Sequence, residues 1–165
     1  MVGYYPDIIP KTNNYPDSIN ESKIVLKKME TPDWEFFKKS DKSPRKPFID
    51  YLEKNNLEYD SKELQKIIDD TYPVIIALKK YYNRPRPQQV NSQIKAAKSK
   101  TAQTPAYPSG HTIQAYVIAK HLTKKYPLKR FKFYSIAKRI SDSRVSVGLH
   151  YPSDNEYAKL LSKQL

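Results

Sequence analysis

The sequence of 165 residues contains no cysteine. This absence excludes disulfides, zinc–thiolate sites, iron–sulfur clusters and a cysteine nucleophile. The chain also lacks any apolar run approaching the roughly 20 residues that a membrane-spanning helix needs. No signal peptide is visible, because the residues after Met1 include tyrosine, proline and aspartate rather than a basic segment and an apolar core. We therefore expect a soluble protein that resides in the cytoplasm or elsewhere inside the cell.

Acidic side chains are scarce in the second half of the chain. The whole sequence has 30 Lys and Arg against 17 Asp and Glu, a formal net charge of +13. Residues 1–78 hold 12 basic and 14 acidic side chains, whereas residues 79–165 hold 18 basic and 3 acidic ones. This asymmetry indicates an anionic partner, which could be a nucleic acid, a membrane surface or a phosphorylated substrate. A compositional preference for lysine is the alternative explanation.

Hydrophobic periodicity predicts helices along the chain and no strand, so we expect an all-α, single-domain helical bundle. The predicted helices run from Asn20 to about Met29, from Pro32 past Phe37, over Phe48 to Leu52, from Asp60 to near Asn83, from about His111 to Lys125, from Pro127 to near Gly148, and from Ser153 past Leu161. Their predicted caps are Asn20, Thr31, Asp60 with Glu63, Ser109, and Ser153 with Glu156. Pro73 is expected to kink its helix. Residues 88–107 are predicted to form a polar loop, with at most a helical turn near 94–97.

The helix expected from Pro127 carries Leu128, Phe131, Ala137 and Ile140 as its apolar residues. Gly148 is placed to end it. Pairs of basic residues at 124–125, 129–130 and 138–139 accompany these apolar residues. The pairs form either a solvated face or a surface that attracts an anionic substrate or bilayer.

The segment Pro108-Ser109-Gly110-His111 predicts the start of a helix with free backbone donors. The first-turn amides would point at any group over the helix end, and Gly110 has no side chain to block its approach. Such a helix start can hold an anion beside an imidazole. The alternative is an ordinary serine cap followed by a surface histidine.

Three cations could surround a phosphate: Lys79, Arg86 and Arg144. The planar guanidinium of arginine suits bidentate binding of tetrahedral oxyanions. Alternatively, Lys79 extends from a helix surface and Arg144 complements a helix C-terminus.

His150 and Asp154 are four residues apart and straddle a turn at Pro152. A carboxylate at Asp154 could accept the proton of one imidazole nitrogen and leave the other nitrogen as a nucleophile. Alternatively, Asp154 only complements a helix dipole. The third histidine, His121, is given no role.

Taken together, these segments resemble the signature of the type 2 phosphatidic acid phosphatase (PAP2) superfamily, which includes class A acid phosphatases and vanadium haloperoxidases. Lys79 precedes Arg86-Pro87 by six intervening residues, Pro108 to His111 supplies the second part, and Ser143-Arg144 precedes His150 by five. Every signature position is filled. The resemblance covers about residues 64–161, so we expect a PAP2-like catalytic core at 61–165. Residues 1–60 form an extension of packing helices without a motif.

The resemblance implies an all-α bundle and a phosphatase mechanism in which His150 attacks phosphorus and forms a phosphohistidine. It implies that Asp154 orients His150 and that His111 protonates the leaving oxygen. The phosphoryl oxygens would be held by Lys79, Arg86, Ser109, Gly110 and Arg144. No metal or other cofactor is expected.

We therefore expect a metal-independent hydrolase of phosphomonoesters, of the acid phosphatase or phosphatidic acid phosphatase type, inhibited by vanadate. Its partner would be a phosphorylated small molecule or lipid headgroup, with peripheral contact to an anionic membrane surface as an additional expectation. One alternative is a haloperoxidase that holds vanadate as its cofactor in the same site. Another, less favoured, is a basic module that binds nucleic acid without catalysis. The leaving group and the oligomeric state stay open.

Overall fold

The computed structural model describes residues 11–165, and these form helices without a strand, as the sequence predicts. The first ten residues of the predicted N-terminal extension lie outside the described part. The elements are, in chain order, η1 (Thr12–Asn14), α1 (Ser18–Lys28), α2 (Trp34–Ser40), α3 (Lys46–Lys54), α4 (Ser61–Tyr82), α5 (Pro87–Val90), η2 (Lys100–Ala102), α6 (Gly110–Lys125), η3 (Pro127–Lys129), α7 (Arg130–Ser146) and α8 (Pro152–Ser162). No helix among residues 11–165 is long and apolar enough to cross a bilayer.

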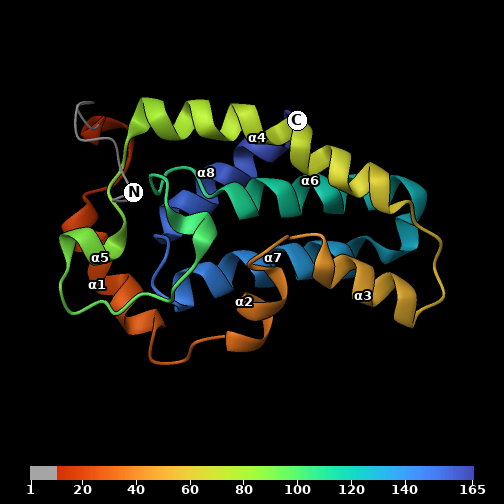
Figure 1. Ribbon diagram of the computed structural model, residues 1–165, viewed down its shortest axis with the longest axis horizontal. Helices are drawn as coiled ribbons and strands as arrows, with labels where there is room; N and C mark the ends of the chain where they lie inside the picture. The colour runs from red at the N-terminus through yellow and green to blue at the C-terminus, as the bar shows by residue number, and fades with distance from the viewer. Residues whose placement is uncertain (1–10) are drawn as a thin grey trace.

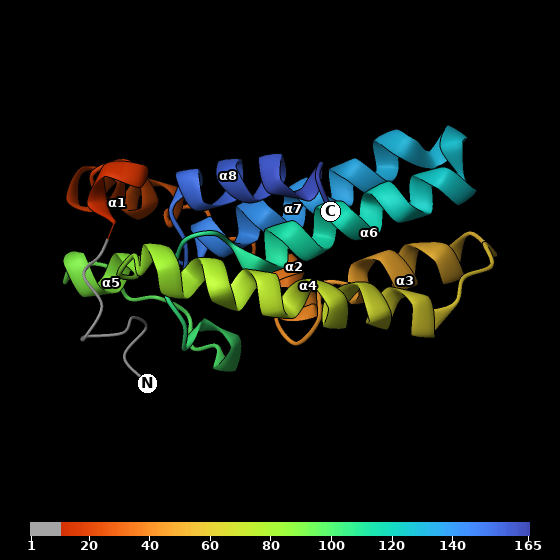
Figure 2. The same cartoon turned by 90° about the horizontal axis from the view of Figure 1, so that it is seen from above.

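Helix α6 is the centre of the bundle and lies between α4 and α7 (Figure 1). Its residues from His111 to Ala119 are all buried, which is unusual for a helix of a small domain and leaves it almost no solvent face. Helix α8 packs against both α6 and α7 (Figure 2). The main core contains buried side chains of α3, α4, α6 and α7, including Phe48, Leu64, Ile118, Phe133 and Ile140.

The N-terminal helices pack on the same core. Helices α1, α2 and α3 all contact α7, and α1 also contacts the short α5. Although the first 60 residues carry no recognisable motif, their packing brings the end of α2 and the first turn of α1 close to the segments that carry the signature.

Three helices begin earlier or later than the caps in the sequence predict. Asp17, not Asn20, caps α1 by accepting the Asn20 amide at 2.8 Å. Asp33, not Thr31, caps α2 by accepting the Phe36 amide at 3.1 Å. Helix α8 begins at Pro152 rather than after Ser153, because proline at the first position is already compatible with the helix.

The region between α4 and α6 is less irregular than expected. Helix α4 continues through Pro73 and ends at Asn83, which adopts the left-handed conformation with φ 48°. Pro87 opens the short helix α5, and a 3₁₀ turn forms at Lys100–Ala102 instead of near 94–97. These segments lie over the start of α6, where the candidate site is built.

Two residues expected on the buried face of α7 are exposed instead. Leu128 is 97% and Phe131 is 89% exposed, while Ala137 and Ile140 are buried as expected. Phe133, two residues after Phe131 and about 200° further around the helix, is fully buried, so Leu128 and Phe131 lie on the side of this helix end that faces away from the core.

Candidate active site

The loop from α7 into α8 holds His150 against Asp154. His150 Nδ1 donates to Asp154 Oδ2 at 2.9 Å, and the Tyr151 amide donates to the same oxygen at 2.9 Å. Because Pro152 starts the helix, Asp154 lies at its third position, from which a carboxylate reaches back to the residues before the helix. A proton held on Nδ1 leaves the Nε2 lone pair of His150 free for bonding on its other side.

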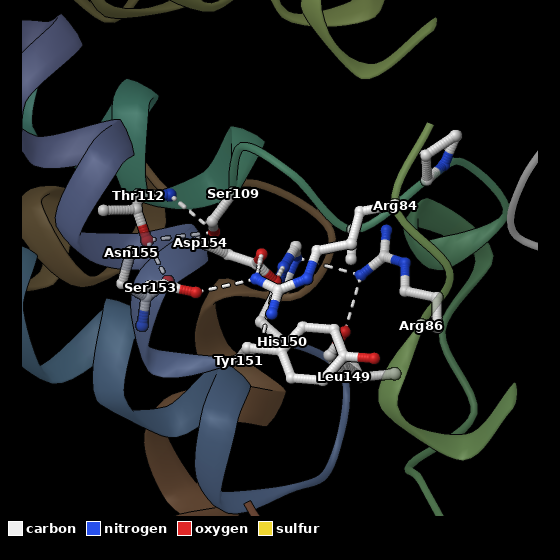
Figure 3. Close-up of polar contacts among 12 residues, drawn as sticks. Arg84, Arg86, Ser109, Thr112, Leu149, His150, Tyr151, Ser153, Asp154 and Asn155 are labelled. Carbon is white, nitrogen blue, oxygen red and sulfur yellow. Dashed lines mark hydrogen bonds and ion pairs between the residues drawn. The ribbon is translucent and has the colours of Figure 1, made fainter. Parts of the chain in front are cut away.

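Arg86 lies on that other side. Its Nη1 atom is 2.9 Å from His150 Nε2 and also donates to the Leu149 carbonyl at 2.8 Å (Figure 3). Arg86 Nε donates to the Thr104 carbonyl at 2.8 Å, so backbone oxygens hold the guanidinium in place. The guanidinium therefore faces the imidazole nitrogen that Asp154 does not contact.

The start of α6 forms the floor of the site. Ser109 caps the helix, accepting the Thr112 amide at 3.4 Å, and is fully buried. A Cβ added at Gly110 would lie 3.1 Å from Ile75 Cγ2, so the glycine allows the helix to start close against α4. His111 follows, and its Nε2 lies 2.9 Å from the Asp41 carbonyl, to which it donates.

Lys79 and Arg144 complete the set of cations. Lys79, near the end of α4, donates from Nζ to the Pro105 carbonyl at 2.6 Å. Arg144 Nη1 forms an ion pair with Asp41 Oδ1 at 2.7 Å. Arg144 Nε is buried and has no hydrogen-bond partner among residues 11–165. This buried donor is available to an oxyanion.

These groups open into one cavity of about 470 Å³. The side of the cavity that carries the signature is lined by Lys79, Arg86, Gly110, His111, Arg144 and His150. Side chains of α4, among them Ile68, Tyr72 and Ile76, also line the cavity. Ser109 and Asp154 lie behind the lining, next to each other, with the Ser109 amide donating to the Asp154 carbonyl at 3.2 Å.

Burial and crowding of positive charge dominate the electrostatics of the cavity. Burial, together with Arg86, holds the pKa of Lys79 well below its ordinary value, and burial with Arg144 lowers the pKa of Arg86 to about 9. Burial also holds the pKa of His150 far below its usual range, and the neighbouring cations, of which Arg86 has the largest effect, lower it further. A neutral imidazole is the form that a nucleophile requires.

The same influences act on His111, whose pKa is lowered to about 3 by burial and by Arg144. A bound phosphate dianion would raise the pKa of both histidines again, because it brings negative charge into a cavity whose charged lining residues are all positive.

Burial raises the pKa of Asp154, while Arg84 and the Tyr151 amide lower it. Since its oxygens accept from three donors, the ionised carboxylate is the form that this geometry favours.

The sequence analysis did not single out Arg84, which lies at the centre of a buried network behind His150. Arg84 Nη1 contacts Asp154 Oδ1 at 2.9 Å, and its Nη2 contacts Glu21 Oε2 at 2.7 Å. Glu21 also accepts from the Ser153 amide at 2.7 Å. The guanidinium stacks on Tyr151, 3.7 Å from the ring centroid. The only sequence signal for Arg84 was the Arg-Pro-Arg-Pro repeat at 84–87. Of its two arginines, only Arg86 was predicted to bind phosphate.

Asp41 is the second residue that the sequence did not identify. Its carboxylate pairs with Arg144, and its carbonyl accepts from His111, so one residue of the α2 end contacts two candidate site residues. Partial burial raises the pKa of Asp41, but hydrogen bonds from Ser99 and Arg144 outweigh this and lower it. An aspartate between two helices has no local pattern that marks it.

The family model of the PAP2 superfamily matches residues 71–162, which is more than half of the chain. The matched range includes every residue of the predicted site and excludes Glu21 and Asp41. A comparison with curated proteins gives no match.

Proposed function

Because the chain belongs to the PAP2 superfamily, whose members generally hydrolyse phosphate esters, we propose that it hydrolyses phosphomonoesters through a phosphohistidine on His150. The observation that carries the proposal is the orientation of His150. Its Nδ1 proton is held by Asp154, and its Nε2 atom faces Arg86 at the edge of a cavity that also contains Lys79 and Arg144.

The first step replaces the P–O bond to the leaving group with a P–N bond to His150. Arg86 Nη1 first changes its partner from His150 Nε2 to an oxygen of the substrate phosphoryl group. The lone pair of Nε2 then attacks phosphorus. As the P–N bond forms, the bond to the leaving oxygen breaks, and that oxygen takes a proton from His111. Asp154 stabilises the positive charge that develops on the imidazole of His150.

His111 reaches the protonated form only with substrate bound. Its Nε2 proton is held by the Asp41 carbonyl, so the imidazolium carries its second proton on Nδ1. In the second step, water attacks phosphorus and the P–N bond breaks. Neutral His111 takes the proton of that water, which releases inorganic phosphate and restores both histidines.

The cavity cations and the α6 amides stabilise the charge of the transferring group. Lys79, Arg86 and Arg144 approach from three different segments, which suits the spread of charge over the equatorial phosphoryl oxygens. We propose that Ser109 acts mainly by holding the first turn of α6, since it lies behind the cavity lining. We propose further that no metal or other cofactor takes part.

The test is phosphate release from p-nitrophenyl phosphate in excess EDTA, with and without vanadate. We expect activity that vanadate inhibits and that His150→Ala removes. His121→Ala is the matched control, because His121 does not line the cavity and its Nε2 lies 3.4 Å from Glu63 Oε2. An acid-labile, alkali-stable phosphoenzyme should be trapped with the wild type. Full activity in His150→Ala would refute the proposed nucleophile.

A further inference from the structure

Leu128 and Phe131 are the most exposed large apolar side chains among residues 11–165, at 97% and 89%. They lie three residues apart on η3 and the first turn of α7, which places them on the same side. The buried face of α7 begins at Phe133. Phe131 precedes it by two residues, or about 200° around the helix, so both side chains extend away from the core.

Exposed cations surround these two side chains. We call residues 124–132 the basic corner, because it holds the exposed Lys124, Lys125, Lys129, Arg130 and Lys132. The sequence has no acidic residue between Asp70 and Asp142. None of the five cations forms an ion pair with any other part of the chain that the structure describes. By contrast, lysines on other helices pair with an acid one turn away, as Lys39 does with Glu35 and Lys66 with Asp70.

The basic corner contacts the connection between α3 and α4. Tyr126 donates to the Glu58 carbonyl at 2.7 Å, which joins the corner to this connection. The carboxylate of Glu53, near the end of α3, accepts from Tyr59 at 2.6 Å, and Lys132 lies over the Tyr51 ring. Lys125 and Arg130 likewise lie over the Tyr126 and Tyr134 rings, and all five cations of the corner remain exposed.

We propose that the basic corner docks on an anionic phospholipid bilayer, with Leu128 and Phe131 inserted among the headgroups and the cations against the lipid phosphates. Two isolated protruding side chains form too small an apolar area for a stable protein interface. A bilayer surface accepts such side chains without a matching hollow, and each neighbouring Lys or Arg adds attraction to anionic lipid.

The position of the corner in the fold agrees with this use. Figures 1 and 2 both place the α6–α7 connection at the end of the molecule opposite α1. No residue of the corner lines the catalytic cavity. Docking is therefore independent of the proposed hydrolysis, and either proposal can fail while the other stands.

The test is sedimentation with vesicles of phosphatidylcholine alone or with about 30% phosphatidylserine. We expect binding only to the anionic vesicles. In the double variant Leu128→Ser/Phe131→Ser the partition coefficient should fall at least about 10-fold. The matched double variant Ile24→Ser/Leu160→Ser replaces side chains that are 49% and 57% exposed elsewhere, and it should bind as the wild type does.

Charge is tested in the same assay by Lys124→Gln/Lys125→Gln, which should weaken binding about 5-fold for each lysine. Lys23→Gln/Lys27→Gln on α1 removes the same charge at a distance and should have little effect. Because the chain has no cysteine, Arg130→Cys can carry a single environment-sensitive fluorophore. Its emission should shift to the blue on vesicle addition, and that of Lys159→Cys should not.

Three results would overturn the proposal. The first is absence of binding to anionic vesicles, or binding that Leu128→Ser/Phe131→Ser leaves unchanged. The second is self-association of the wild type that the same variant abolishes, which would assign the corner to a second copy of the chain. The third is binding of duplex DNA through Lys124 and Lys125 without binding to vesicles. Hydrolysis of p-nitrophenyl phosphate should be equal in the wild type and Leu128→Ser/Phe131→Ser.

Discussion

Replacing Glu21 by glutamine tests whether helix α1 supports the candidate nucleophile. Glu21 is 7% exposed and accepts from Arg84 Nη2 at 2.7 Å, from the Ser153 amide at 2.7 Å and from Ser153 Oγ at 2.6 Å. Glutamine removes the charge and turns an NH₂ group toward one of these donors. Removing one partner of a buried ion pair costs about 3–5 kcal/mol. Because Asp154 still pairs with Arg84, we expect the lower figure, about 3 kcal/mol.

The assay is urea unfolding, supported by thermal melts. For a protein of this size, each kcal/mol lowers Tm by about 2–4 °C, so Glu21→Gln should lower it by about 6–12 °C. The matched control is Glu35→Gln, which breaks an exposed pair with Lys39 in the same N-terminal region and should leave Tm unchanged. We also expect a lower kcat with little change in KM. Without the Glu21 carboxylate, Arg84 interacts more strongly with Asp154, which then stabilises the positive charge on His150 less. Equal stability of the two variants would refute the buried network as a support of the site.

Three further predictions concern the cavity. Gly110→Ala should raise KM for a phosphomonoester several-fold, because the new Cβ, 3.1 Å from Ile75 Cγ2, pushes the start of α6 from α4; an unchanged KM would contradict the close packing. Inorganic phosphate should raise Tm in the wild type and much less in Arg144→Ala, measured by thermal melts; equal shifts would remove Arg144 from the phosphate site. The free energy of unfolding should be greatest above about pH 6.5 and should fall as the pH drops toward 3, by at most about 1.4 kcal/mol per pH unit for each of His111 and His150. The sign follows because both histidines have lowered pKa values in the folded chain, so the unfolded chain binds more protons in this range; a flat urea-unfolding profile that His111→Asn leaves unaltered would refute it.

Local sequence signals predicted the secondary structure well wherever the cause lies within a few residues. The Ser109 cap, the end of α4 at Asn83 and the all-α class are confirmed. Helix starts were misplaced where two neighbouring residues could both cap, as with Asp17 and Asn20. The turn that follows Pro87 was missed because four residues carry too little periodicity to distinguish a short helix from a loop.

The identities and spacings of short segments predict the candidate site residues, and the structure brings six of them, Lys79, Arg86, Gly110, His111, Arg144 and His150, to one cavity. The contact of His150 with Asp154 depends only on the turn at Pro152, so it could be anticipated from four residues. The cavity forms where α4, α6 and α7 pack together, and the order of the motifs along the chain does not predict this packing.

The partners of those residues depended on the packing of distant segments. Glu21 meets Arg84, and Asp41 meets Arg144, across more than 60 residues of chain in each case. Likewise, the periodicity of α7 marks Phe131 as apolar but cannot show that it lies on the side of the helix that faces away from the core. Short-range rules describe how a backbone turns and which residue types share a face. Which charges neutralise one another, and which apolar side chains remain outside the core, follow only from where whole helices come to lie.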